Sequence, residues 1–456
     1  MTAPRNLTII QASDLIKRRL LSPVDLAIDL LKVSQDHEDM LRVWSYMDPS
    51  KTLHMARICE QEIESGKYKG PMHGIPIGIK DIYFTEDMKT TCGSPIYENF
   101  YSDYDAQTVK ILRSNGAIIM GKTITTQFAC GDPPVTKNPW NSDRTPGGSS
   151  SGSAVGVAAR FFPAALGSQT AGSVLRPAAY NGIVGFKPTY GLISKSGVYP
   201  VAPSLDTVGW LTRCVSDARI LFQNLVEFNS KTEDSTKSND TNVKAEYLEN
   251  KNIRLGIVNQ YYPDMVDPES GKSFESLVSL LTSKGVNCET SNLDVDFDEI
   301  LASHGAIMSS EAAHTHSKDF SIRPEDYAVN VKQLIKTGLE TSALNYLAAK
   351  KVQNDIKSKL SDMLSIYDAL ITPTSISGAP SKTTTGQPTF QAPWTFSGNP
   401  TINLPYTLDS DGLPIGVQII GRHLEEMKLL CIAEYLETII CFDAHPTLTI
   451  KSNQNL

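Results

Sequence analysis

Two loops built from small residues lie close together in the chain: PGGSSSGSA spans Pro146–Ala154, and GSQTAGSVLRPA spans Gly167–Ala178. Glycines permit tight bends, and serines beside a helix start present hydroxyls together with free backbone amides. Loops of this kind can aim several N–H groups at one point, which is what an oxyanion hole requires. The pair therefore predicts a catalytic centre rather than a simple surface connection.

A lysine lies upstream of both loops. The apolar run Gly74–Ile79 ends at Lys80, which is followed by Asp81. Burial at such a position disfavours the charged ammonium, lowers its pKa and leaves a neutral amine that can act as a base. Serine with lysine is an established form of activated nucleophile that needs no histidine. Taken alone, each loop is also typical of a surface loop, and Lys80 of a lysine whose stem packs on the surface. Together, the two loops and Lys80 favour a catalytic site.

Two shorter motifs point to other chemistry, but their context is unfavourable. Gly116–Thr123, GAIIMGKT, matches the phosphate-binding pattern G-x-x-x-x-G-K-[ST], yet its middle residues are an apolar strand and not a glycine-rich arc. Gly148–Gly152 matches the nucleophile elbow G-x-S-x-G with Ser150 at its centre. An elbow follows a hydrophobic strand, whereas residues 138–146 are polar. Neither an NTPase nor a histidine-based hydrolase triad is favoured.

Composition excludes several classes of protein. The 456 residues carry a net charge of −8, so nucleic acid is not expected as the main ligand. A hydrophobic content of 40% supports a large core. No apolar run approaches the roughly 18 residues that span a bilayer, and no signal peptide is visible, so neither membrane attachment nor secretion is expected.

Cysteine and histidine usage indicates a reducing compartment and no metal. Seven scattered cysteines without a CxxC pair are typical of free thiols, so we expect a cytoplasmic protein. His314 and His316 form the one close histidine pair, but no carboxylate or thiol stands at metal-ligand spacing beside them. Neither a metal nor another cofactor is expected.

Hydrophobic periodicity alternates between strand-like and helix-like segments along the chain. Ser22 followed by Pro23 is a helix-start signal within 7–65, which as a whole is predicted to be helical. Alternating strands and helices predict an α/β fold with a largely parallel or mixed sheet. Predicted strands are 71–80, 117–120, 253–258, 367–372 and 413–420, and predicted helices are 105–115, 274–281, 346–364 and 425–440.

The chain resembles the amidase signature family over most of its length. The motifs that carry the resemblance are Gly74–Asp81 (GxPxxxKD), Gly121–Ala129 (GKTxxxQFA), Asn138–Asn141 (NPWN), Pro146–Ala154, Gly167–Pro177, Gly182–Gly191, Ser204–Gly209 and Gly412–Gly421. The resemblance implies a three-layer α/β/α fold with a large mixed, mostly parallel, twisted sheet. It also implies one domain over 1–456, made of N-terminal helices (1–66), a catalytic core (67–225), a variable substrate-side region with a polar loop at 229–250 (226–345) and a C-terminal part that completes the sheet (346–456).

The resemblance also implies roles for individual residues. Ser173 is the nucleophile, Ser149 bridges, and neutral Lys80 is the base that accepts a proton through Ser149. The peptide Gly148–Ser149 is expected to be cis. The amides of Thr170, Ala171, Gly172 and Ser173 hold the oxyanion, and Ala129 is placed with them in substrate binding.

The substrate pocket is less defined. Segments 127–133, 304–316 and 393–399 are expected to line it, and Phe128, Cys130 and Trp394 would suit an apolar or aromatic acyl group. Ordinary core packing explains those three side chains equally well.

Three positions depart from the commonest family pattern. Gln169 stands in place of Asp, Ala171 in place of Gly, and Arg176 lies three residues after Ser173 and not two. Alanine tolerates fewer backbone conformations than glycine, which bears on the oxyanion geometry.

The resulting hypothesis is a stand-alone amidase that hydrolyses a small-molecule carboxamide to carboxylate and ammonia or amine, with a homodimer as its assembly. The alternative is the A subunit of a glutamyl-tRNA(Gln)/aspartyl-tRNA(Asn) amidotransferase, which generates ammonia from glutamine for a partner enzyme. The loop departures favour the first.

Overall fold

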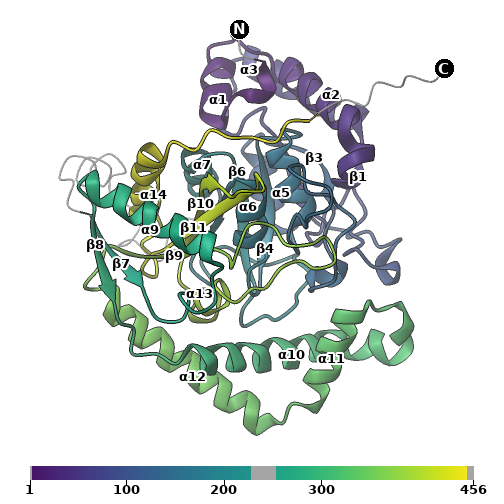
Figure 1. Cartoon of the computed structure of the whole chain (residues 1–456). Coiled ribbons are helices and arrows are strands. Elements are labelled where there is room, and N and C mark those ends of the chain that lie inside the picture. The colour runs from purple at the N-terminus through teal and green to yellow at the C-terminus, as the bar shows by residue number, and fades with distance from the viewer. Residues whose placement is uncertain (1–2, 227–252, 449–456) are drawn as a thin grey trace, which may run out of the picture.

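One sheet of eleven strands forms the centre of the computed structural model, which describes residues 3–226 and 253–448 (Figure 1). The strand order is β1-β3-β2-β4-β6-β5-β10-β11-β9-β7-β8. The polar segment 229–250, expected to be a loop, lies outside the described residues. The strands are β1 Trp44–Met47, β2 Pro76–Lys80, β3 Ile118–Thr123, β4 Ala164–Gln169, β5 Val184–Lys187, β6 Thr207–Thr212, β7 Arg254–Val258, β8 Asn287–Ser291, β9 Ala369–Pro373, β10 Thr401–Leu408 and β11 Pro414–Ile420.

The sheet is mixed, as expected, but the expectation that it is mostly parallel is wrong for the described strands. Parallel pairs occur in two groups, β3-β2-β4 and β9-β7-β8. The strands between these groups, and the edge strand β1, pair antiparallel. The connection from β10 to β11 spans only residues 409–413, and so short a link joins antiparallel neighbours, whereas parallel neighbours need a crossover of a dozen residues or more.

Helices cover both faces of the sheet, which confirms the α/β class. Central strands such as β4, β6 and β11 are buried at every position, as strands are when both faces are covered. Gly209 faces Val174 at the start of α6, whereas the indole of the next residue, Trp210, donates to Ala218 of α7 on the opposite face. The helices are α1 Ile9–Lys17, α2 Pro23–Leu41, α3 Pro49–Glu64, α4 Gln107–Ser114, α5 Ser151–Ala158, α6 Leu175–Asn181, α7 Val215–Leu225, α9 Pro268–Ser283, α10 Phe297–Ile322, α11 Val329–Glu340, α12 Ala343–Met363, α13 Ala392–Ser397 and α14 Glu426–Ile440.

The N-terminal helices begin where the sequence predicts. Ser22 Oγ accepts hydrogen bonds from the amides of Val24 (2.9 Å) and Asp25 (3.4 Å), and Pro23 is the first residue of α2. The prediction of helix throughout 7–65 missed β1. That four-residue strand exists through its pairing with β3, a contact between segments far apart in the chain.

Three helices extend the molecule beyond the sheet. α10 packs against both α11 and α12, and these green helices form a layer along the bottom of Figure 1. The short helix α13 contacts α10 and α12, and thereby connects this layer with the centre of the molecule. No helix in the described part of the chain is long and apolar enough to cross a membrane.

Candidate active site

Lys80 is the last residue of β2, which lies between β3 and β4, and its side chain is fully buried. Its Nζ atom lies 2.7 Å from Ser149 Oγ and 2.8 Å from Ser168 Oγ. Desolvation lowers the pKa of Lys80 to about 7, although the nearby Asp206 opposes that shift. A substantial fraction of neutral amine is therefore present at neutral pH, in contact with a serine hydroxyl.

Ser149 precedes α5 and is almost completely buried. The Gly148–Ser149 peptide is cis, which confirms the expectation. Arg176 Nη2 donates to the Gly148 carbonyl at 2.7 Å, and Thr126 N donates to the Ser149 carbonyl at 3.4 Å. The cis peptide and the predicted bridging serine are thus held from two sides, by the side chain of Arg176 on α6 and by the backbone amide of Thr126.

Ser173 lies in the short loop between β4 and α6 and is 8% exposed, against 0% for Lys80. Gln169, one of the departures from the family pattern, organises this loop. Its Oε1 atom accepts hydrogen bonds from the amides of Val174 (2.9 Å) and Leu175 (3.0 Å). Gln169 therefore satisfies two backbone amides at the start of α6, the helix that follows the predicted nucleophile, and its amide oxygen does so where the family commonly has an aspartate.

Free amides surround the predicted nucleophile. Within residues 3–226 and 253–448, no hydrogen bond engages the backbone N–H of Ala171, Gly172 or Ser173. A Cβ atom on Gly172 would lie 2.4 Å from Gln391 Oε1, so a larger residue there would require the buried side chain of Gln391 to move. Ala171 has no positive φ, so its methyl group is tolerated where the family commonly has glycine.

Two polar groups near the site were not predicted from the sequence, although both lie in or beside quoted motifs. Ser168 places its hydroxyl against Lys80. Asp206 accepts hydrogen bonds from Thr170 Oγ1 (2.6 Å) and Val201 N (2.9 Å), and desolvation raises its pKa. The position of Asp206 within the motif SLDTVG was a usable signal, since an acidic residue in an otherwise uncharged motif needs polar partners if it is buried.

The three predicted pocket side chains are buried. Phe128 has no exposed surface and packs against the rings of Tyr97, Tyr199, His316 and Tyr327. This environment is that of an aromatic core. The other two are similarly enclosed, Cys130 at 3% and Trp394 at 2% exposure. A role for these side chains in acyl-group recognition stays a prediction.

The segments expected around the pocket do converge. The side chain of Gln127 donates to the Asp326 carbonyl and accepts from the amide of Ala328, which attaches segment 127–133 to the region before α11. His304 and Thr395, from the other two segments, donate to carbonyls of the loop that contains Ser173. Ala129, predicted in substrate binding, already donates its amide to the Thr126 carbonyl at 2.9 Å.

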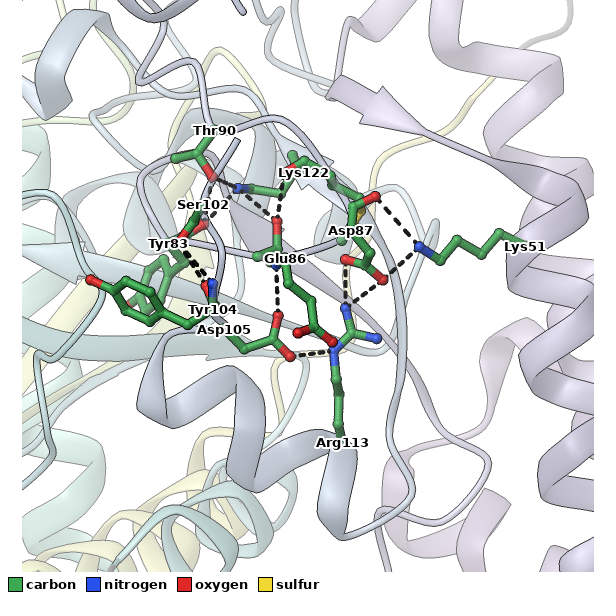
Figure 2. Close-up of polar contacts among 12 residues, drawn as sticks. Lys51, Tyr83, Glu86, Asp87, Thr90, Ser102, Tyr104, Asp105, Arg113 and Lys122 are labelled. Atoms are coloured by element: carbon green, nitrogen blue, oxygen red, sulfur yellow. Dashed lines mark hydrogen bonds and ion pairs between the residues drawn. The ribbon is translucent and has the colours of Figure 1, made fainter. Parts of the chain in front are cut away.

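The lysine of the phosphate-binding pattern is a structural group. Lys122 lies on β3, fully buried, and its Nζ atom donates to the Tyr83 carbonyl (2.5 Å) and to Thr90 Oγ1 (2.7 Å), as Figure 2 shows. It also lies 3.4 Å from Asp81 Oδ1. Most of the motif forms β3, as its apolar middle residues predict.

One group of potential metal ligands exists among the described residues: Cys59, Glu62 and His73. The polar atoms of these three residues have hydrogen-bond or ion-pair partners within the protein. His73 Nδ1 accepts from the amide of Lys69, so its other nitrogen carries the hydrogen and faces Glu62 at 3.0 Å. Lys69 Nζ also pairs with Glu62 at 2.7 Å.

Comparison with known proteins identifies the class. The Amidase family model matches residues 29–430, so the chain belongs to the amidase family. The glutamyl-tRNA(Gln) amidotransferase A subunit of Thermodesulfovibrio yellowstonii is 33% identical over 460 residues, covering 92% of this chain and 94% of that protein. The protein of the same name from Halothermothrix orenii is 32% identical over 471 residues, covering 95% and 97%. The crystal structure of an amidase, 27% identical, matches with a TM-score of 0.85 over 95% of this chain and 99% of that chain.

Proposed function

We propose that the chain hydrolyses a carboxamide C–N bond through Ser173, Ser149 and Lys80. The observation that carries this proposal is the fully buried Lys80 Nζ at 2.7 Å from Ser149 Oγ, with a pKa lowered to about 7. A buried lysine without that shift would be charged and could not accept a proton.

The proposed reaction has two halves. Neutral Lys80 takes the Ser149 proton while Ser149 takes the Ser173 proton, and Ser173 Oγ attacks the amide carbonyl. The free amides of Ala171, Gly172 and Ser173 stabilise the oxyanion. The proton returns through Ser149 to the leaving nitrogen, the C–N bond breaks, and water then hydrolyses the acyl-enzyme by the same relay.

Two settings for this chemistry have support. The curated relatives favour a subunit that releases ammonia from glutamine for a tRNA-dependent amidotransferase, because A subunits of that enzyme match nearly the whole chain. The nucleophile loop favours a stand-alone amidase, because Gln169 and Ala171 depart from the form expected of the A subunit. A homodimer and a cytoplasmic location remain predictions in either setting.

The test uses the purified full-length chain. Ammonia release is measured with glutamine, asparagine and a panel of aliphatic, aryl and ureido amides, and a fluorophosphonate is used to label the nucleophile for mass spectrometry. Turnover by the chain alone supports the stand-alone setting, whereas glutamine turnover only with partner subunits supports the amidotransferase setting. Absence of both turnover and labelling at Ser173 would overturn the proposed chemistry.

The pH dependence of kcat/KM tests the base. Below its pKa, Lys80 is protonated and cannot accept a proton, so kcat/KM should rise by roughly tenfold per pH unit and level off above about 7. The measurement is a profile of kcat/KM from pH 5 to pH 10. A rate that continues to rise through pH 10 would mean that Lys80 keeps its ordinary pKa.

A further inference from the structure

Two carbonyl groups of the nucleophile loop accept hydrogen bonds from side chains of distant helices. The Thr170 carbonyl accepts from His304 Nε2 at 2.8 Å. The next carbonyl, that of Ala171, accepts from Thr395 Oγ1 at 2.7 Å. Both donor side chains are buried, His304 on α10 and Thr395 on α13.

These two peptide groups also carry amides of the predicted oxyanion hole. The carbonyl of Thr170 and the N–H of Ala171 belong to one planar peptide unit, and the carbonyl of Ala171 belongs with the N–H of Gly172. A donor at the carbonyl end fixes the orientation of the whole unit. It also polarises the unit, so that the N–H at the other end becomes a stronger donor.

Each donor is itself held in place. Thr395 Oγ1 accepts from Gln169 Nε2 at 3.0 Å and lies closer to the Ala171 carbonyl than to the Gln391 carbonyl on its own helix, at 3.2 Å. The imidazole of His304 contacts the ring of Phe396 at a centroid distance of 6.4 Å. Since its partner is a carbonyl, His304 Nε2 carries the hydrogen, and burial lowers the pKa of His304, which favours the neutral ring.

We propose that His304 and Thr395 are positioning residues of the oxyanion hole, which orient and polarise the peptides whose N–H groups stabilise the tetrahedral intermediate. The proposal rests on the proposed function of Ser173. It gives α10, in the region expected to vary with substrate, a direct effect on the chemical step. It also explains Gln169, which reaches both the helix start after Ser173 and the hydroxyl of Thr395.

The test compares His304→Leu and Thr395→Val with the wild-type protein, using the amide that the wild type turns over fastest. Loss of one direct oxyanion donor costs about 10²–10³ in kcat. Loss of a hydrogen bond to the carbonyl of the same peptide only weakens that donor, so kcat should fall roughly tenfold and KM should stay nearly unchanged. The affinity for phenylboronic acid, which forms a tetrahedral adduct with serine, should fall by the same factor as kcat/KM.

Rescue and control variants separate loss of the hydrogen bond to the carbonyl from a general loss of folding or stability. His304→Gln and Thr395→Ser keep a donor and should recover most of the lost kcat. The matched control is His54→Leu, the same change at an exposed site on α3, which should leave kcat and the thermal midpoint unchanged. Thermal unfolding of every variant identifies any that fail to fold; Thr395→Val then carries the test if His304→Leu is unfolded.

Either of two results would overturn the inference: a kcat in folded His304→Leu and Thr395→Val equal to that of the control, or a loss that falls on KM with phenylboronic acid affinity unchanged. These results differ from failure of the proposed function, in which the wild-type protein itself neither turns over amides nor is labelled at Ser173.

Discussion

A Ser173→Ala variant should lose at least about 10⁴-fold in kcat while folding normally. Without Oγ there is no acyl-enzyme, so only water activated in the site could attack the amide. The substitution removes one atom from a side chain that is 8% exposed, so no large cavity forms and the thermal midpoint should stay close to that of the wild type. Ammonia release and thermal unfolding, measured on the same preparation, check both statements.

Ser150→Ala is the matched control for Ser173→Ala, because Ser150 is the centre of the competing elbow motif. Ser150 is fully buried, and its Oγ atom lies 3.4 Å from the Ser168 carbonyl, at the weak end of hydrogen-bond range. Most activity and the fluorophosphonate label should therefore remain in this variant. Normal turnover by Ser173→Ala, or a label on Ser150, would contradict the assignment of the nucleophile.

A Lys80→Met variant should lose about 10³-fold or more in kcat/KM, because the serine relay then has no base. Methionine has a similar length and no charge, so it suits a site with no exposed surface, and the protein should fold. The residual activity should also lose the inflection near pH 7 that neutral Lys80 produces. The measurement is the profile of kcat/KM against pH for both proteins.

Lys122→Met provides the control. Lys122 is as fully buried as Lys80, and it contacts Asp81 and Tyr83, which directly follow β2. Its ammonium lies 3.4 Å from Asp81, and removal of one partner from a buried ion pair costs about 3 kcal/mol of unfolding free energy. Lys122→Met should therefore be less stable but keep the inflection near pH 7. Retention of wild-type kcat/KM by Lys80→Met, or loss of the inflection in folded Lys122→Met alone, would refute the assignment of the base.

Local signals predicted many elements correctly because their causes are local. Ser22 caps α2 through bonds to residues two and three positions away. The apolar middle of GAIIMGKT forms β3, as the pattern indicated. By contrast, β10 pairs with β5 through residues more than 200 positions apart, and no local signal specifies that these two strands become neighbours.

The sequence by itself determined which residues are predicted to carry the chemistry: it places a lysine after an apolar strand and serines in two loops of small residues. The tertiary structure alone decided what those residues can do. Lys80 meets Ser168 across 88 positions, and the carbonyls of Thr170 and Ala171 meet His304 and Thr395 across 134 and 224. A lowered pKa and a polarised peptide both depend on desolvation and on dipoles within a few ångströms, and those neighbours are assembled only when distant segments pack together.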